Sequence, residues 1–272
     1  MMRDVARGWH ADDASIGLVP TMGALHAGHM SLVERARREN DRVVVSVFVN
    51  PIQFGAGEDL SEYPRSPERD LSKLRAAGVD AIYKPSVADI YPPAASTRVI
   101  VHGVTERLEG AARPGHFEGV ATVVTKLFTA TSADRAYFGQ KDAQQLAVVM
   151  RLAADLDIGV EIRVCPTVRE ADGLALSSRN AYLSPNERRA AVCLSRALGL
   201  AAEAYGRGER DPGRLRAILV EAIGAEPLAK LDYAEVVDPA TFSTPGSLAV
   251  LAVRIGPTRL IDNHDLKLPY PG

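Results

Sequence analysis

The sequence has few of the features that mark secreted, membrane-bound or metal-binding proteins. Its 272 residues include only two cysteines, Cys165 and Cys193, which are far apart and lack metal-ligand spacing. We therefore interpret them as reduced thiols. No apolar run approaches the roughly 18 residues that a membrane span needs. The N-terminal stretch MMRDVARGWHADDAS is polar and lacks the apolar core of a signal peptide. These absences predict a cytoplasmic protein without a membrane partner.

A strong excess of charge of either sign is also missing. The chain has 32 Lys and Arg against 34 Asp and Glu, a formal net charge of −2. A main partner such as nucleic acid would favour a basic surplus, so we expect no nucleic-acid partner. With 46% hydrophobic and 24% charged residues, the composition is that of an ordinary globular protein. The length allows one large or two medium domains.

Hydrophobic strand-like runs alternate with helical patterns over about the first 180 residues. RVVVSVFVN (42–50) is typical of a strand buried on both faces of a parallel sheet. A shorter run, IGLVP, is expected to stop at Pro20. The next helix signals are Ser66 as N-cap, Pro67 at the first helical position and Gly78 as the stop. Strands that alternate with helices predict βαβ units, and therefore an α/β fold with a doubly wound parallel sheet.

From about Val168 the pattern changes. Two helical segments, the first with Ser184 as N-cap and Glu187 at the capping-box position, precede three strand-like runs. We therefore predict an α/β domain of residues 1–167 and a smaller α+β domain of residues 168–272. The connection TVREADGLALSSRN lies between them, where ligand clefts are frequent.

Polar, glycine-bearing segments follow the predicted strands. They are TMGALHAGH, NPIQF, GQKDAQQ and TVREADGLALSSRN. In doubly wound sheets, ligands bind beyond the carboxyl ends of the strands, which share one edge of the sheet. The four segments therefore predict a functional site at that edge.

Two of the six histidines, His26 and His29, stand around Gly28 where the first strand gives way to a helix. A helix N-terminus attracts phosphate through its unpaired N–H groups and its dipole, and Gly28 lets a ligand approach the backbone. The dipole disfavours imidazolium, so we expect both rings to be neutral donors facing one triphosphate. The alternative is a pair of capping or surface histidines. Zinc is a poor fit, because no third ligand is nearby in the sequence.

The HAGH segment resembles the HxGH signature of Rossmann-like nucleotidyltransferases. With FVNPIQFGAGEDLSEYPR, RPGHFEGVATVV, AYFGQKDAQQL and PTVREADGLALSSRNAYLS, most of residues 16–184 resembles the pantoate–β-alanine ligase family. The C-terminal region is less similar. The resemblance implies a homodimer that uses ATP and Mg²⁺. It also implies two steps: (R)-pantoate and ATP give enzyme-bound pantoyl adenylate and pyrophosphate, and the β-alanine amine then displaces AMP to form pantothenate.

The resemblance further implies an ATP site made of backbone, hydroxyl, imidazole and charged groups: Met22, Gly23, His26, Gly28, His29, Gly139, Lys141, Asp142, Val168, Leu176, Ser177, Ser178 and Arg179. Four of these residues are expected to be catalytic: His29, His26, Lys141 and Arg179. His29 would stabilise the transition state, while His26 would hold the phosphates. Asp142 would accept from the ribose, and Val168 would contact adenine through its backbone.

The two acid substrates are expected to bind amide side chains. By resemblance, Gln53 would bind pantoate and then β-alanine, Gln145 would hold pantoate from the opposite side, and Asn50 would stand beside them. An amide suits this task because it binds carboxylate and hydroxyl groups without adding charge. Asp70 is the candidate magnesium ligand. Plainer alternatives stay open: Gln53 as a turn residue, Lys141 as a solvated side chain and Asp70 as a helix-surface carboxylate.

The chain departs from the family pattern at several places, among them the two that follow. Ala27 stands between the histidines, where relatives often carry an acid, and we expect little effect because it would point away from the nucleotide. The stretch before VPTMG is short and only weakly strand-like, whereas the family usually has a strand there. Arg113 and His116, in RPGHF, are expected to belong to a nearby segment that is either flexible or supporting.

Two other classes of function compete with the ligase. One is an HxGH enzyme that leaves a nucleotide on a phosphorylated acceptor, and the amides of NPIQF and DAQQL disfavour it, since they suit a small carboxylate better. The other is a nucleotide-binding protein without catalysis. The combination of His26, His29, Lys141 and Arg179 disfavours that reading.

Overall fold

The computed structural model describes residues 2–270 and divides into two units. Unit 1 runs to Gly139 and includes residues 145–165, and unit 2 consists of residues 140–144 and the chain from Pro166 onward. The sequence-based boundary between residues 167 and 168 takes no account of the short segment 140–144. No helix within residues 2–270 is long and apolar enough to cross a membrane.

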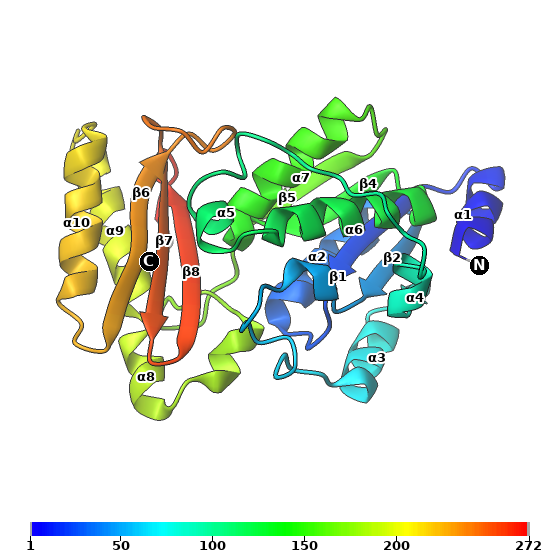
Figure 1. Ribbon diagram of the computed structural model, residues 1–272, viewed down its shortest axis with the longest axis horizontal. Helices are drawn as coiled ribbons and strands as arrows, with labels where there is room; N and C mark the ends of the chain where they lie inside the picture. The colour runs from blue at the N-terminus through cyan, green and yellow to red at the C-terminus, as the bar shows by residue number, and fades with distance from the viewer. Residues whose placement is uncertain (1, 271–272) are drawn as a thin grey trace. The chain divides into compact units, whose positions relative to one another are not determined.

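Unit 1 is built on a parallel sheet of five strands among the described residues, in the order β3-β2-β1-β4-β5 (Figure 1). The strands are β1 (Ile16–Thr21), β2 (Arg42–Val47), β3 (Ala81–Tyr83), β4 (Arg135–Gly139) and β5 (Glu161–Cys165). The strand order reverses between β1 and β4, which confirms the predicted doubly wound sheet. Ligands bind such sheets beyond the carboxyl ends of the strands at the reversal.

Helices cover both faces of this sheet. They are α1 (Met2–Ala11), α2 (Ala27–Glu39), α3 (Pro67–Ala76), α4 (Val87–Ile90), α5 (Glu109–Ala112), α6 (His116–Thr131) and α7 (Ala143–Asp155), with the short turn η1 (Pro51–Gln53) after β2. On one face, α2 and α3 bury Val33 and Leu74 in a cluster with Tyr137 of β4. The next residue, Phe138, points to the other face and meets Phe128 of α6 edge-on. The reversal therefore places α2 and α6 on opposite faces (Figure 1).

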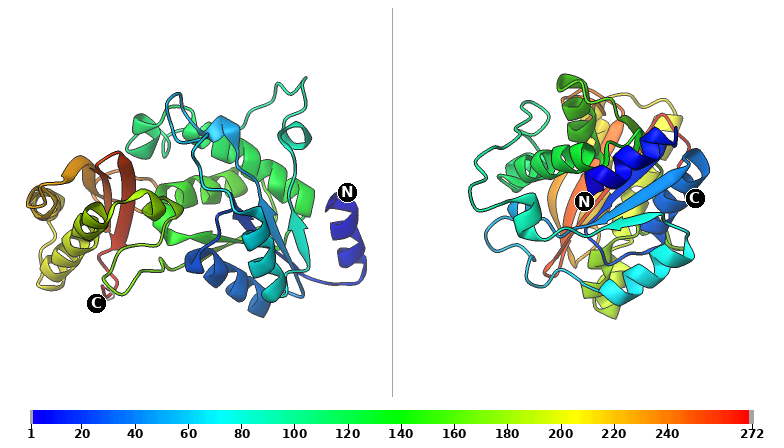
Figure 2. Two further views of the ribbon diagram at one scale, coloured as in Figure 1. Left: turned by 90° about the horizontal axis from the view of Figure 1, so that it is seen from below. Right: turned by 90° about the vertical axis from the view of Figure 1, so that its right-hand side faces the viewer.

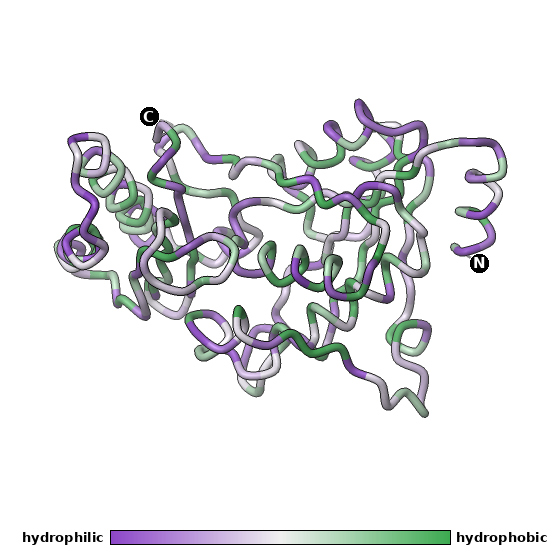
Figure 3. The backbone as a smooth tube through the Cα atoms, turned by 90° about the horizontal axis from the view of Figure 1, so that it is seen from above, coloured by the Kyte–Doolittle hydropathy of each residue, from purple (hydrophilic) through white to green (hydrophobic). Residues whose placement is uncertain are grey.

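Two details of unit 1 differ from the sequence-based expectations. Strand β1 contains Pro20 and ends at Thr21, rather than stopping at the proline. Pairing with β4 covers only Gly17 and Leu18, so the missing N–H of Pro20 falls where one neighbour has already separated. The weakly strand-like N-terminal stretch forms helix α1, which Figure 3 shows to be mostly hydrophilic. The edges of the sheet are therefore β3 and β5.

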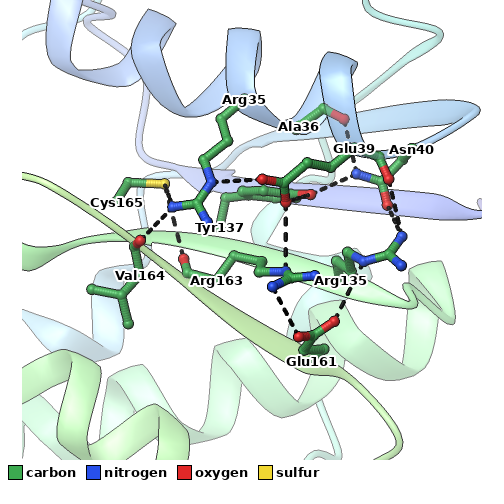
Figure 4. Close-up of polar contacts among 10 residues, drawn as sticks. All are labelled: Arg35, Ala36, Glu39, Asn40, Arg135, Tyr137, Glu161, Arg163, Val164 and Cys165. Carbon is green, nitrogen blue, oxygen red and sulfur yellow. Dashed lines mark hydrogen bonds and ion pairs between the residues drawn. The ribbon is translucent and has the colours of Figure 1, made fainter.

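The last turn of α2 is tied to β4 and β5 through Glu39 (Figure 4). Its carboxylate accepts from Arg35 Nε over 2.8 Å and from Tyr137 Oη over 2.9 Å. Arg163 Nε lies 3.5 Å away. The hydrogen bond from Arg35 lowers the pKa of Glu39, and burial raises the pKa of Tyr137 to about 12, so acceptor and donor keep their roles at neutral pH. This network fixes the C-terminal end of α2 and with it the direction of the helix.

Unit 2 is the predicted smaller α+β part, an antiparallel sheet of order β6-β7-β8 with helices packed on it. Its elements are β6 (Ala229–Val237), β7 (Leu248–Ile255), β8 (Thr258–Asp265), α8 (Pro185–Ala190), α9 (Cys193–Gly206), α10 (Pro212–Gly224) and the turns η2 (Gln140–Asp142) and η3 (Ser178–Tyr182). Leu198 of α9 and Leu219 of α10 bury against Leu251 of β7, where Figure 2 shows the two helices side by side. The predicted capping box of Ser184 and Glu187 begins α8.

Candidate active site

His26 and His29 form the N-terminal cap of α2. His26 Nδ1 accepts from the Gly28 amide over 3.2 Å, and His29 Nδ1 accepts from the His26 amide over 3.3 Å. A ring nitrogen that accepts carries no proton, so both imidazoles are neutral with their hydrogen on Nε2. The two ring centroids are 4.0 Å apart. Capping uses Nδ1 of each ring, so the capping role does not conflict with the predicted ligand role.

Helix α3 holds the loop that precedes this cap. Asp70 accepts from the Ala24 amide over 2.9 Å and from the Leu25 amide over 2.8 Å, and Lys73 Nζ donates to the Leu25 carbonyl. Gly23 and Ala24 both have positive φ, of 85° and 50°, which a glycine tolerates and an alanine resists. The carboxylate of Asp70 compensates for this strained turn. With 3% of its surface exposed, Asp70 is not the helix-surface carboxylate of the plainer reading.

Asp70 fits the expected magnesium site poorly. Each of its oxygens already accepts from a backbone amide. Among residues 2–270, no group of three His, Cys, Asp or Glu side chains is arranged to hold a metal ion. Magnesium demands octahedral oxygen coordination and, with nucleotides, draws much of it from phosphates and water. The geometry therefore favours a positioning role for this carboxylate.

The amide of Gln53, at the end of η1, is held by its neighbours. Asn50 Nδ2 donates to Gln53 Oε1 over 3.1 Å and to the Gly119 carbonyl over 3.0 Å. Tyr91 Oη donates to Asn50 Oδ1 over 2.8 Å, and burial raises the pKa of Tyr91 to about 12, so it stays a donor. Gln53 Nε2 lies 3.1 Å from Met22 Sδ. Gln53 thus contacts both Met22 and Asn50, the other two predicted site residues of this region.

Arg113 and His116 support the backbone of Gln53, which is one of the two roles expected for that segment. Arg113 makes a two-pronged ion pair with Glu58, with N···O distances of 2.8 and 2.6 Å. Its Nη1 also donates to His116 Nε2 over 3.1 Å, and His116 Nδ1 donates to the Gln53 carbonyl over 2.9 Å. Burial lowers the pKa of His116 to about 4, so the ring is neutral. An ion pair and a histidine thus hold Gln53 from the backbone side.

The end of β4 leads from unit 1 into unit 2. Apart from its chain neighbours, no atom of the described residues lies within 4 Å of a Cβ built at Gly139, so internal packing does not demand glycine there. Lys141 and Asp142 follow in η2, with Lys141 Nζ 3.8 Å from the carboxylate. Gln145 is half-buried in the first turn of α7 and belongs to unit 1.

The remaining predicted nucleotide residues lie in unit 2. The Leu176 amide donates to the Val168 carbonyl over 2.9 Å, which closes residues 168–176 into a hairpin. Ser177 caps η3 by accepting from the Arg179 amide over 3.3 Å. Ser178 and Arg179 are half-buried in that turn. These residues thus lie in a hairpin and in the turn that follows it.

Sequence reasoning missed two residues around Gln53. Tyr91 stands outside every motif, and its contact with Asn50 spans 41 positions. Glu58 lies within FVNPIQFGAGEDLSEYPR, but nothing in that motif indicates that Arg113, 55 positions away, is its partner. The single sequence carries no signal for either contact.

Known proteins resemble this chain over nearly its whole length. A family model described as pantoate-beta-alanine ligase matches residues 1–265. The pantothenate synthetase of Roseiflexus castenholzii is 58% identical over 254 residues, which cover 92% of this chain and 91% of that protein. The relative of the same name from Herpetosiphon aurantiacus is 52% identical and covers 96% of both chains.

Solved structures agree as well. A crystal structure of pantothenate synthetase from Thermus thermophilus matches with a TM-score of 0.90 at 50% identity, over 94% of each chain. Pantoate-beta-alanine ligase from Francisella tularensis, complexed with beta-gamma ATP and beta-alanine, matches with a TM-score of 0.80 at 35% identity, over 98% of this chain and 97% of that one. Since a family model, relatives above half identity and solved structures cover nearly all of its length, the chain belongs to the pantoate–β-alanine ligase family.

Proposed function

We propose that the chain condenses (R)-pantoate with β-alanine to form pantothenate at the expense of ATP. A carboxylate oxygen of pantoate attacks the α-phosphorus, the bond to the bridging oxygen breaks, and pyrophosphate leaves. The β-alanine amine then attacks the acyl carbon of enzyme-bound pantoyl adenylate, and AMP leaves. Adenylation gives a poor electrophile a good leaving group. The protein therefore contributes mainly positioning and charge neutralisation.

The observation that carries the proposal is the capping of α2 by Nδ1 of both His26 and His29. Both rings use Nδ1 as a capping acceptor and carry their proton on Nε2. Two N–H donors at the positive end of the α2 dipole suit phosphate oxygens whose charge grows as the bond to pyrophosphate breaks. His29 would stabilise that transition state, and His26 would hold the phosphates.

The other nucleotide contacts follow from the chemistry of each group. Lys141 would neutralise phosphate as a mobile point charge, and Arg179 would donate from its planar fork. Asp142 would accept from a ribose hydroxyl, and Val168 would contact adenine through its backbone. The remaining candidates for the nucleotide are Met22, Gly23, Gly28, Gly139, Leu176, Ser177 and Ser178.

Gln53 and Gln145 would bind the acids. The Gln53 amide offers donors to a carboxylate without a counter-charge that would have to be released with the product. Asn50 acts here as the group that orients Gln53, since its own amide donates to the Gln53 oxygen. Unit 2 would act as the lid domain.

Magnesium enters this proposal with the substrate. The triphosphate would hold the cation, with water completing its coordination, and no step depends on a protein ligand. Asp70 would contribute by shaping the loop before α2. We also propose a cytoplasmic homodimer, as the family resemblance implies. Sedimentation velocity at assay concentration tests the dimer, and a single monomeric species would contradict it.

The decisive experiment separates the two half-reactions. Purified protein with ATP, Mg²⁺ and pantoate should catalyse exchange of labelled pyrophosphate into ATP before β-alanine is added. AMP and pantothenate should then appear only when both acids are present. A stable nucleotidylated product would indicate the other class of HxGH enzyme. Tight ATP binding without any exchange would indicate a protein that only binds nucleotide.

A further inference from the structure

Strand β8 carries two adjacent buried polar residues that the proposed reaction does not use. Asp262 is 2% exposed and Asn263 is 4% exposed. Buried polar side chains require hydrogen-bond partners. Asp262 Oδ1 accepts from the Asn263 amide over 2.8 Å. The other side-chain partners of both residues lie outside the β6-β7-β8 sheet, in segments that the family resemblance assigns to the nucleotide.

Asn263 binds the turn η2. Its Nδ2 donates to the carbonyls of Gln140, over 3.0 Å, and Lys141, over 2.8 Å. Its Oδ1 accepts from Gln140 Nε2 over 3.3 Å. One side-chain amide therefore satisfies two consecutive backbone carbonyls. These bonds are a physical reason why residues 140–144 belong to unit 2, although they follow β4 of unit 1.

Asp262 holds the second segment through Arg169. Arg169 donates from Nη1 and Nη2 to the two carboxylate oxygens, over 2.6 and 3.0 Å. The same Nη1 donates to the Gly173 carbonyl over 3.0 Å, across the hairpin of residues 168–176. The two side chains of this pair are 9% and 1% exposed, so water competes little for them. A fork-to-carboxylate pair fixes orientation as well as distance.

Consecutive side chains of a strand project to opposite faces, so β8 can bind one segment with each face. We infer that the dipeptide Asp262–Asn263 positions the two nucleotide-binding segments of unit 2. Asn263 fixes the backbone from which Lys141 extends, and Asp262 fixes the Val168 hairpin through Arg169. The inference rests on the proposed function, because the roles of Lys141 and Val168 do. Asp262 and Asn263 are positioning residues, since they act through other residues.

Fixing the backbone at Lys141 affects how its side chain can bind a phosphate. A lysine side chain has a flexible stem of four carbons. Holding its ammonium group at one phosphate therefore costs less conformational entropy when the backbone is already fixed. Asn263 supplies that fixation without a charge. An aspartate at 263 would instead turn an acceptor toward two carbonyl oxygens, and we expect it to be worse than alanine.

The test combines kinetics with amide hydrogen exchange. N263A should raise the KM for ATP about tenfold and lower the pyrophosphate-exchange kcat, while the KM for pantoate stays within twofold. Hydrogen exchange should become faster in residues 139–143 and not in 168–176. R169K, which loses the fork, should show the reverse distribution. N186A, which removes an exposed asparagine of the same unit, is the matched control and should change neither.

The outcomes separate this inference from the proposed function. If the unaltered protein makes no pantothenate but N263A still weakens ATP binding and loosens residues 139–143, the function fails and the positioning role survives. If N263A unfolds, the variant Q140A, which truncates a half-buried glutamine, tests the contact between Gln140 Nε2 and Asn263 Oδ1. It should raise the KM for ATP and the exchange rate of residues 139–143, each by less than N263A. Unchanged ATP kinetics together with unchanged exchange in 139–143 would overturn the inference.

Discussion

His116 Nδ1 donates a hydrogen bond to the Gln53 carbonyl over 2.9 Å, while Nε2 of the same ring accepts from Arg113. A carbonyl can only accept and a guanidinium can only donate, so these partners require the neutral ring with its proton on Nδ1. Protonation would place a second N–H against the Arg113 cation. The backbone of the proposed acid-binding glutamine thus depends on the protonation state of one buried histidine.

This relationship predicts a pH-dependent stability. The pKa of His116 is lowered from 6.5 to about 4, chiefly by burial. Between these values the unfolded chain binds a proton that the folded chain does not, so this contribution is complete above pH 6.5 and is lost as pH falls toward 4. The loss at pH 5 is about 2 kcal/mol. Urea unfolding at pH 7.5 and 5 should show H116Q, which cannot titrate, losing less stability than the parent. An equal loss in both proteins would contradict the assignment.

Substitution of His29 should separate capping from catalysis. H29A removes both the proposed donor and a capping acceptor, so adenylate formation should fall by about 10²–10³ and stability by about 1 kcal/mol. H29Q places a standard capping-box residue at the same position and should restore stability but not the rate. Pyrophosphate exchange and thermal unfolding measure the two effects. A kcat for H29Q within a few-fold of the parent would refute the catalytic role.

The amide of Gln53 should determine affinity for both acids. Q53A should raise the KM for pantoate and for β-alanine about tenfold or more, since it removes a hydrogen-bonding group from a buried site. Q53E should be worse, because it sets a negative charge against the substrate carboxylates. The KM for ATP serves as the internal control. Unchanged KM values for both acids would remove Gln53 from the site.

Gly119 offers a way to move Gln53 without changing it. A Cβ at position 119 would lie 2.6 Å from Gln53 Cα and 2.7 Å from the Ile52 carbonyl oxygen, so η1 must shift. G119A should therefore raise the KM for both acids and lower stability by about 1–3 kcal/mol. G224A, at a helical glycine with open space around it, is the matched control and should leave the kinetics intact. If G119A and G224A have the same KM values for the two acids, the close packing at Gly119 does not affect substrate binding.

Asp70 can be tested as a loop support against a metal ligand. D70N keeps one acceptor oxygen but turns an N–H₂ group toward a backbone amide, so the loop before α2 should loosen and the KM for ATP should rise about tenfold. Magnesium titration should give an unchanged half-saturating concentration. E68Q, an exposed carboxylate on the same helix turn, should alter neither. A selective increase in the magnesium requirement of D70N would restore the metal-ligand interpretation.

The sequence by itself determined the alternation of strands and helices, the capping box at Ser184, and the order of the polar segments along the chain. These features are local: hydrophobic periodicity and capping residues act within a few positions. Because the carboxyl ends of parallel strands share one edge, the order of elements also placed the segments that follow β1 and β2 at the same edge of the sheet of unit 1. Pro20 shows the limit of such reasoning, since its tolerance depends on where β4 stops pairing.

Only the tertiary structure decided what each polar group does. The proton positions on His26 and His29 follow from the cap geometry, and the task of Asp70 follows from two amides more than forty positions earlier. Asn263 meets Lys141 across 122 positions. Contacts of this kind arise when packing brings buried donors and acceptors together and each must find a partner, a requirement that spacing along the chain does not express.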